Sequence, residues 1–343
     1  MVRNTIRKRA TITQVAQLAG VSNGTVSNLL NGTAPVSRET AQRITDAIKA
    51  LNYVPDVMAS SLRRGNSRII QVLTPNMNNT FYTRVLSSFT DSAYPQGYFV
   101  NVFGYEYSAE RERRLLANTG SSMTGAVIVF NGYGDEDEIE ALVRRGVPVI
   151  LADRETEIDG VPCVAFDNKK VFGDIVQELM NRGYRRIGLF TEPPSLENVK
   201  ARCASFRAAI IKYGYEFDDH SVFSRDDLCL DNLKNGCAFM KEILQTHDKS
   251  ELPDAWIASS DVLAIGMLQA IRECNYRVPD DFGVVGFDNI DVSGYVNPKL
   301  TTVEQDQERF GRELWAMVSK VLKGEHPVGN VILPQRLIIR ESC

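Results

Sequence analysis

The sequence predicts a small all-α head with a helix-turn-helix, followed by an α/β core built from two doubly wound parallel-sheet subdomains. Two observations lead to this fold class. Near the N-terminus, apolar residues recur at helical spacing and are interrupted by a turn that contains glycine. Further along the 343-residue chain, short apolar runs alternate with helical stretches, and this alternation occurs in two sets. We expect the head in residues 1–55, a hinge helix or linker in 56–66 and the core in 67–343.

The charge of the chain is divided unevenly between these parts. Residues 1–64 hold nine Lys and Arg residues and three acidic residues, whereas the remaining residues hold 30 basic and 40 acidic ones. A basic head on an acidic body favours a polyanion as the partner of the head alone. A basic terminus that is merely solvated would carry the same charge, so the charge alone does not decide whether the head binds a polyanion.

Hydropathy and cysteine spacing indicate a cytoplasmic protein. No stretch approaches about 18 consecutive apolar residues, so we expect no transmembrane helix and no membrane partner. The basic residues before position 10 are not followed by an apolar segment, which argues against a secretory signal. The six cysteines form no CxxC pair, so reduced thiols are expected rather than a zinc or thioredoxin-like site.

The first two helices of the head are marked by their caps. Thr11 and Gln14 fit a capping box at the start of the first helix, and Gly20 ends that helix. Ser22 then reads as the N-cap of a second helix over residues 23–30. Two short helices joined by a tight turn are typical of a helix-turn-helix.

A third helix follows the second. Asn31 and Gly32 form a turn signal, and Ser37 caps a helix that runs to Leu51 with apolar residues at helical spacing. A generic three-helix bundle would give the same pattern, and the basic charge of the head favours the helix-turn-helix over it.

The head also resembles a known family. The segment TITQVAQLAGVS at 11–22, with TVS at 25–27 and LLNG at 29–32, is similar to the N-terminal signature of the LacI/GalR bacterial transcription regulators. The similarity continues through VPDDFGVVG at 278–286 and PKLTTVEQD at 298–306, so it covers almost the whole chain. The resemblance implies a DNA-binding regulator, a homodimer and a core of the periplasmic-binding-protein type.

The resemblance also implies how the head would bind DNA. The second helix enters the major groove, where Asn23, Gly24 and Asn28 hold the base-reading positions. Ser22 would face a phosphate, and Thr25 and Ser27 would supply hydroxyls to the backbone. Gly24 departs from many relatives because it has no side chain with which to read a base. The DNA-binding set expected in the head is Thr11, Ser22, Asn23, Gly24, Thr25, Ser27, Asn28, Asn31 and Tyr53.

Residues 56–66 are expected to form a hinge helix. Pro55 ends the third helix and Asp56 can cap a short helical segment, although a plain solvated linker would fit the same residues. Ala59 to Leu62 match the family's hinge pattern, in which an exposed leucine wedges into the minor groove at the operator centre. Leu62 is therefore the expected wedge, with Arg63 beside a phosphate. A helix this short is expected to fold only on DNA, paired with the hinge of a second subunit.

The core should contain two sets of parallel strands and helices. The expected strands are 69–74, 98–103, 125–130, 147–151, 186–190, 255–258 and 282–286. The expected helices lie near 81–94, 108–118, 135–145, 170–183, 200–213, 232–246 and 261–274. We expect an N-subdomain of about 67–165 plus 299–329, and a C-subdomain of about 166–298 plus 330–343.

Polar residues follow several of these strands, where ligands bind in doubly wound sheets. Each of them alone is more often a helix cap or a surface charge than a ligand contact, but several would converge at one cleft. By the resemblance, Asp153, Arg202, Asp288 and Gln305 are polar effector contacts. The effector-binding set expected is Phe81, Tyr82, Asp153, Phe166, Arg202, Asp261, Asp288 and Gln305, in which Phe81 and Tyr82 form one aromatic wall and Phe166 lines the opposite side.

Two or three acidic residues in a cleft favour a polyhydroxyl effector, so a sugar or sugar phosphate is expected. A co-repressor-dependent regulator that senses a nucleobase or another metabolite is the alternative. A solute-binding protein of the same fold would have a signal peptide and no basic head. The sequence predicts neither an enzyme nor a cofactor or metal site, because its three histidines lack triad or metal-ligand spacing and it has no Walker A or GxGxxG loop.

Overall fold

The computed structural model describes residues 10–54, 67–120, 124–134, 136–218, 221–325 and 328–343. The expected hinge residues Ala59, Leu62 and Arg63 lie outside the described residues, as does the side chain of Asn31. The chain divides into two units, residues 1–67 and 68–343, and each is described by itself. Among the described residues, no helix is long and apolar enough to cross a membrane.

The head consists of α1 (Ile12–Ala19), α2 (Asn23–Asn31) and α3 (Arg38–Ala50), as the sequence predicts. Thr11 and Gln14 form both halves of the capping box. Gly20 ends α1 with a φ of 67°, a left-handed conformation that favours glycine. The three helices are held by a small hydrophobic cluster whose fully buried members include Val26 and Ile44.

The first sheet of the core has the strand order β11-β5-β4-β3-β1-β2, and its paired strands are parallel. Its strands are β1 (Ile69–Thr74), β2 (Phe99–Gly104), β3 (Ala126–Phe130), β4 (Val149–Ala152), β5 (Cys163–Phe166) and β11 (Val331–Leu333). The helices of this subdomain are α5 (Thr80–Ala93), α6 (Ala109–Ala117), α7 (Glu136–Arg144) and α12 (Gln307–Leu322). The short 3₁₀ helix η1 (Tyr94–Gln96) follows α5. We call this part the N-subdomain.

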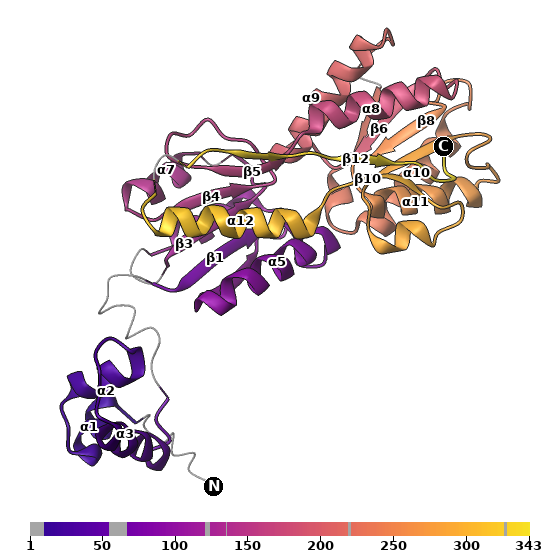
Figure 1. Cartoon of the computed structure of the whole chain (residues 1–343). Coiled ribbons are helices and arrows are strands. Elements are labelled where there is room, and N and C mark those ends of the chain that lie inside the picture. Colours follow the sequence, from indigo (N-terminus) through magenta and orange to yellow (C-terminus); the bar gives the residue numbers. More distant parts are fainter. Residues whose placement is uncertain (1–9, 55–66, 121–123, 135, 219–220, 326–327) are drawn as a thin grey trace. The chain divides into compact units, whose positions relative to one another are not determined.

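The second sheet has the order β12-β10-β9-β8-β6-β7, and only the β10–β12 pair is antiparallel among its described pairs. Its strands are β6 (Ile187–Thr191), β7 (Val222–Ser224), β8 (Ala255–Ala258), β9 (Gly283–Asp288), β10 (Thr301–Glu304) and β12 (Arg336–Ile338). Its helices are α8 (Asn168–Asn181), α9 (Glu197–Lys212), α10 (Asn232–Thr246) and α11 (Asp261–Glu273), with the 3₁₀ helices η3 (Asp226–Cys229) and η4 (Asp291–Gly294). This part is the C-subdomain, and Figure 1 shows the two sheets with their covering helices.

The chain passes between the subdomains at different residues from those expected. β10 lies in the second sheet, where Thr302 pairs with Gly286, so the expected return to the N-subdomain at residue 299 is wrong. β11 lies in the first sheet, where Ile332 pairs with Ala165, so the expected departure at residue 330 is wrong as well. The return crossings instead fall between β10 and α12 and between β11 and β12. Leu300 lies on the C-subdomain side of the first crossing, because its buried side chain belongs to the C-subdomain core.

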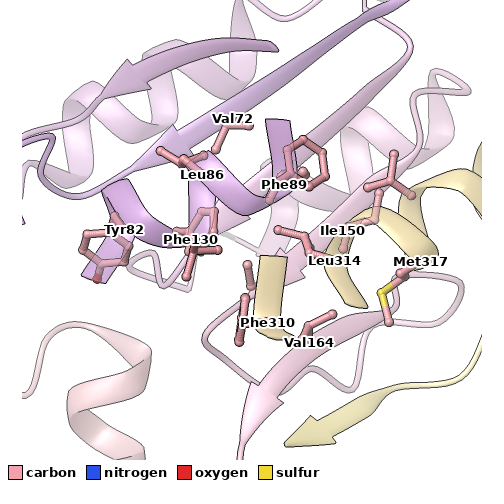
Figure 2. Close-up of a cluster of buried hydrophobic side chains, with 14 of the residues drawn as sticks. Val72, Tyr82, Leu86, Phe89, Phe130, Ile150, Val164, Phe310, Leu314 and Met317 are labelled. Carbon is pink, nitrogen blue, oxygen red and sulfur yellow. The ribbon is translucent and has the colours of Figure 1, made fainter. Parts of the chain in front are cut away.

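The helix α12 was missed in the sequence, although it packs in the centre of the N-subdomain. Phe310, Leu314 and Met317 recur at helical spacing and join the hydrophobic cluster drawn in Figure 2. The ring of Phe310 stacks on Phe130 at 6.2 Å between centroids. α12 approaches α5 closely at Gly311, where a Cβ atom would come within 2.6 Å of the carbonyl oxygen of Val85.

Candidate functional site

A cleft lies between the subdomains at the carboxyl ends of several strands. Its cavity measures about 30 Å³, which is room for a water molecule or two. Both subdomains line it, and most of the lining residues are polar or aromatic. They are Asn79, Phe81, Tyr82, Tyr107, Asn131, Asp153, Glu192, Leu196, Asn198, Val199, Arg202, Ser259, Ser260 and Asp288.

Arg202 is the central cation of the cleft. It projects from α9 and is buried. Its Nη1 donates to the carbonyl oxygen of Ser259 at 2.5 Å and its Nη2 to Oε1 of Gln305 at 3.5 Å. The guanidinium carbon lies 4.5 Å from the centroid of the Phe287 ring, which adds a cation–π contact. These contacts hold the guanidinium in one orientation.

Asp153 and Asp288 are the two predicted acids that reach the cleft. Both are buried, and burial raises the pKa of each carboxyl above its ordinary value, against the opposing effect of the Arg202 charge. The pKa of Asp288 is also raised by the neighbouring acids, Asp153 among them. Both residues have a positive φ, 58° for Asp153 and 106° for Asp288. Strained backbone in non-glycine residues is enriched at functional sites.

Asn198 joins the subdomains across the cleft. Its Nδ2 donates to Oδ2 of Asp153 at 2.7 Å, and its backbone N–H donates to Oδ1 of Asn131 at 2.9 Å. The backbone N–H of Glu197 donates to the carbonyl oxygen of Gly132 at 3.1 Å. α9 has no side-chain cap of its own, so its first two amides are satisfied by the loop that follows β3 of the N-subdomain.

Two aromatic lining residues of the cavity, Phe81 and Tyr82, come from α5. The ring of Tyr82 packs edge-to-face on Phe81 at 5.2 Å and on Phe130 at 5.6 Å between centroids. Burial raises the pKa of the Tyr82 hydroxyl, and the nearby charge of Asp153 raises it further. The hydroxyl is therefore neutral at physiological pH and can donate a hydrogen bond to a ligand.

Three residues of the expected effector set do not line the cavity. Phe166 lies in the hydrophobic core, tilted against Phe310 at 5.0 Å, so it is no wall of the cleft. Gln305 is buried behind Arg202 and bonds to it. Asp261 accepts hydrogen bonds from the backbone N–H of Ile290 at 2.9 Å and from the hydroxyls of Ser293 and Thr302.

Asp261 fixes the loop after β9 instead of meeting a ligand. It is fully buried, and burial raises the pKa of its carboxyl to about 6. Gly286 makes room for it, because a Cβ at Gly286 would come within 2.2 Å of Oδ1 of Asp261. The loop it holds follows directly on Asp288, so Asp261 positions that residue without touching the cavity.

We expect the substitution Asp261→Asn to destabilise the core. The amide nitrogen it introduces cannot accept a hydrogen bond, which leaves a buried donor unpaired at a cost of about 2 kcal/mol. Urea unfolding of wild type and variant measures the change. A large loss of ligand affinity with no loss of stability would instead make Asp261 a ligand contact.

The sequence reasoning missed Glu192, Asn131, Asn198 and Tyr107. Glu192 and Asn131 come directly after β6 and β3. The rule that selected Asp153 and Asp288, a polar residue at the end of a strand, would have found both. Asn198 and Tyr107 carry no such signal, because they belong to a helix start and a loop.

The N-terminal end of α2 is the candidate DNA-binding surface of the head. The Ser22 hydroxyl accepts from the backbone N–H of Thr25 at 3.1 Å and bonds to the Thr25 hydroxyl at 3.0 Å. Asn23 Nδ2 donates to the Thr13 hydroxyl at 3.3 Å, and Oδ1 of Asn28 accepts from the Thr33 hydroxyl at 3.0 Å. These polar side chains are exposed or half-buried, with their amides oriented by neighbours.

Gly24 is not required by the fold of the head. A Cβ there would meet only the Ser22 hydroxyl, at 3.6 Å, which is ordinary contact. Thr11 caps α1, and Ser27 is half-buried on α2. Tyr53 packs against the hydrophobic cluster of the head, so part of its side chain stabilises the fold.

Among the described residues, no cluster of His, Cys, Asp or Glu could hold a metal ion.

Family models match both units. Residues 11–56 match the model of bacterial regulatory proteins of the lacI family, and residues 176–343 match a periplasmic binding protein-like domain. The regulator CelR of Thermobifida fusca is 31% identical, with 98% of this chain and 99% of CelR covered. The HTH-type transcriptional repressor PurR of Mannheimia succiniciproducens is 27% identical, with 97% of this chain and 98% of PurR covered.

Solved structures match over nearly the full length. A Lac repressor dimer bound to operator and the anti-inducer ONPF is similar with a TM-score of 0.84 and 25% identity, covering 98% of this chain and 99% of that one. A CelR–cellobiose complex has a TM-score of 0.70 and 27% identity, covering 98% and 100%. The predicted fold class is thereby confirmed, and the chain belongs to the lacI family of bacterial regulatory proteins, which are DNA-binding regulators of transcription.

Proposed function

We propose that this protein is a repressor that binds a pseudo-palindromic operator as a homodimer, and that a small polyhydroxyl ligand in the cleft controls this binding. The observation that carries the proposal is the convergence of Asp153, Asp288 and Arg202 from different strands and helices on one cavity between the subdomains. The ligand class is a sugar or sugar phosphate, because carboxylates, amides and a guanidinium suit vicinal hydroxyl groups. The CelR–cellobiose complex supports this class.

Binding in the cleft is coupled to movement of the subdomains. A cavity of about 30 Å³ admits water, whereas small-molecule sites usually measure several hundred Å³. We infer that the cleft opens to take up its ligand. Opening breaks the contacts of Asn198 with the N-subdomain and the ion pair of Arg84 on α5 with Asp291 on η4. Ligand binding thus biases one subdomain arrangement over another.

A second copy of the chain is proposed to cover apolar surface on both subdomains. β2 is an edge strand whose Phe99 and Phe103 are exposed, and Tyr94 packs edge-to-face on Phe99 at 6.3 Å. On the C-subdomain, Tyr295 is 88% exposed. Exposed aromatic patches and bare strand edges are typical of protein interfaces, and a two-fold dimer would present two heads to the two half-sites of an operator. We place this dimer in the cytoplasm.

The operator is best identified by selection from a random pool of DNA duplexes with the purified full-length protein. We expect an enriched palindrome with a central pyrimidine–purine step, since such steps kink easily around an apolar wedge. Affinity should fall about 1000-fold or more between 50 and 200 mM salt, because phosphate contacts dominate binding. No enriched sequence, with or without a mixture of cell metabolites, would contradict the proposed function.

The Leu62→Ala variant tests the proposed wedge. We expect its affinity for the selected operator to fall at least about tenfold, because the kink would lose its apolar support. Its affinity for random DNA should stay near that of wild type, because that binding depends on the phosphates. Gel-shift titrations on both DNAs measure the two changes. An equal loss on both would reject the wedge.

A further inference from the structure

Within the effector role proposed above, we propose that the ligand of the cleft carries a protonated amine on a polyhydroxyl frame, as an amino sugar does. This narrows the ligand class named above, because it excludes sugar phosphates. The proposal rests on the acids that line the cavity, on the contacts that already occupy the two Nη atoms of Arg202, and on aromatic residues among the same lining residues.

The cavity has an excess of negative charge. Asp153, Glu192 and Asp288 line it, and Arg202 is the single cation among its lining residues. None of the ion pairs found among the described residues involves any of the three acids. Buried carboxylates are costly unless a positive charge or several donors compensate them. The single guanidinium lowers the pKa of Asp153 and of Asp288 but does not offset the effect of burial, so both pKa values stay raised and a further cation would favour the ionised acids.

Arg202 is also already engaged by the protein. Its two Nη atoms donate to the carbonyl oxygen of Ser259 and to Gln305, and one face of its guanidinium covers the Phe287 ring. A phosphate group is usually recognised by two parallel N–H donors of a free guanidinium fork. In this cleft each Nη atom has one acceptor from the protein, whereas Nε is buried without a partner, so the protein occupies only part of the five N–H donors.

Glu192 is fixed as an acceptor facing the cavity. Its Oε1 accepts from Nδ2 of Asn232 at 2.7 Å, and its Oε2 accepts from the hydroxyl of Ser259. Both donors are neutral, so they orient the carboxylate without cancelling its charge. The charge of Glu192 raises the pKa of Asp288 on the same subdomain and that of Tyr107 on the opposite one. Glu192 therefore adds to the field across the cleft.

The remaining lining residues complete a site for an amine with hydroxyl groups. Phe81, Tyr82 and Tyr107 are the aromatic lining residues, and aromatic rings can stabilise a nearby cation. Asn79, Asn131 and Ser260 supply amides and a hydroxyl that can bond sugar hydroxyls. An ammonium group would favour the ionised form of these acids and gain charge-assisted hydrogen bonds from them, whereas the negative charge of a phosphate would disfavour that form.

The test measures binding of matched sugars to the full-length protein by calorimetry. The probes are glucosamine, galactosamine and mannosamine, each with its parent sugar and its 6-phosphate. We expect at least one amino sugar to bind at least tenfold more tightly than its parent, and no 6-phosphate to bind measurably. Glu192→Gln should reduce amino-sugar affinity at least tenfold, and Glu325→Gln, which removes one exposed acid outside the cleft, serves as the matched control.

Four outcomes overturn the inference. They are measurable binding of a 6-phosphate, equal binding of amino sugar and parent, no binding of any of the three amino sugars, and binding of spermidine as tight as that of the best amino sugar, which would reduce the effect to general charge attraction. Operator selection with the same protein preparations distinguishes failure of the amine inference from failure of the proposed repressor function. If the protein selects an operator and a neutral sugar releases it, the proposed function stands and the inference of an amine-bearing ligand is refuted.

Discussion

Replacing Asp288 by alanine is expected to abolish the response to effector while operator binding stays intact. The carboxyl is buried in the cleft and no described side chain bonds to it, so it is available to the ligand. Loss of a charged hydrogen-bond partner in such a site costs about 3 kcal/mol, or about 100-fold in affinity. The backbone carbonyl of Asp288, which accepts from Nε2 of Gln307 at 2.7 Å, is retained in the variant.

This expectation is checked by operator release. Wild type and variant are titrated on the selected operator with the ligand that releases the wild type, and the concentrations at half release are compared. Asp159→Ala removes an exposed acid of the N-subdomain and should leave the response unchanged. Asp288→Asn keeps the shape of the side chain and separates loss of charge from loss of packing. A normal response in Asp288→Ala would move the ligand site elsewhere.

Replacing Arg202 by methionine should destabilise the core by about 3–5 kcal/mol at pH 8, because it leaves buried acids without their cation. The sign of the pH dependence follows from the same acids. Burial raises the pKa of Asp153 and of Asp288, and Arg202 opposes both shifts. Without the guanidinium both pKa values rise further. The cost of holding the acids ionised therefore applies at high pH and declines as the pH falls through their raised pKa values.

Urea unfolding at pH 5 and pH 8 measures this difference. We expect the gap between wild type and Arg202→Met to be smaller at pH 5, and a further Asp288→Asn substitution to restore part of the stability at pH 8. Arg207→Met, on the exposed face of the same helix, is the matched control. A gap of equal size at both pH values would show that packing, and not charge, is what Arg202 supplies.

The fold was predictable wherever local signals are strong. The capping residues Thr11, Ser22 and Ser37 mark the helices of the head, and each makes the expected bond to a backbone amide. The strands β7, β11 and β12 span three residues each, which is too short for a periodic pattern. The pattern of α12 was present in the sequence, with apolar residues at positions 310, 314 and 317, and was overlooked.

The cleft residues that lie at the ends of strands could be predicted from the sequence. Asp153, Asp261 and Asp288 all lie near strand ends, and the sequence cannot separate the two that reach the cavity from the one that fixes a loop. The partners of Asp261 lie between residues 290 and 302, some 30 to 40 positions away. Phe166 poses a similar difficulty, because β5 is buried on both faces and alternation does not reveal which way its last side chain points.

Because α9 lacks a side-chain cap, the core favours the arrangement in which the two subdomains are in contact, which we call closed. When the subdomains separate, the amides of Glu197 and Asn198 lose Gly132 and Asn131 as acceptors and must be hydrated instead. At about 1 kcal/mol for each bond, the two together correspond to a population ratio of about 30 in favour of the closed arrangement. The start of α9 thus contributes to the free-energy difference between the two arrangements in the absence of ligand. The ligand's differential affinity for the two arrangements adds to this difference.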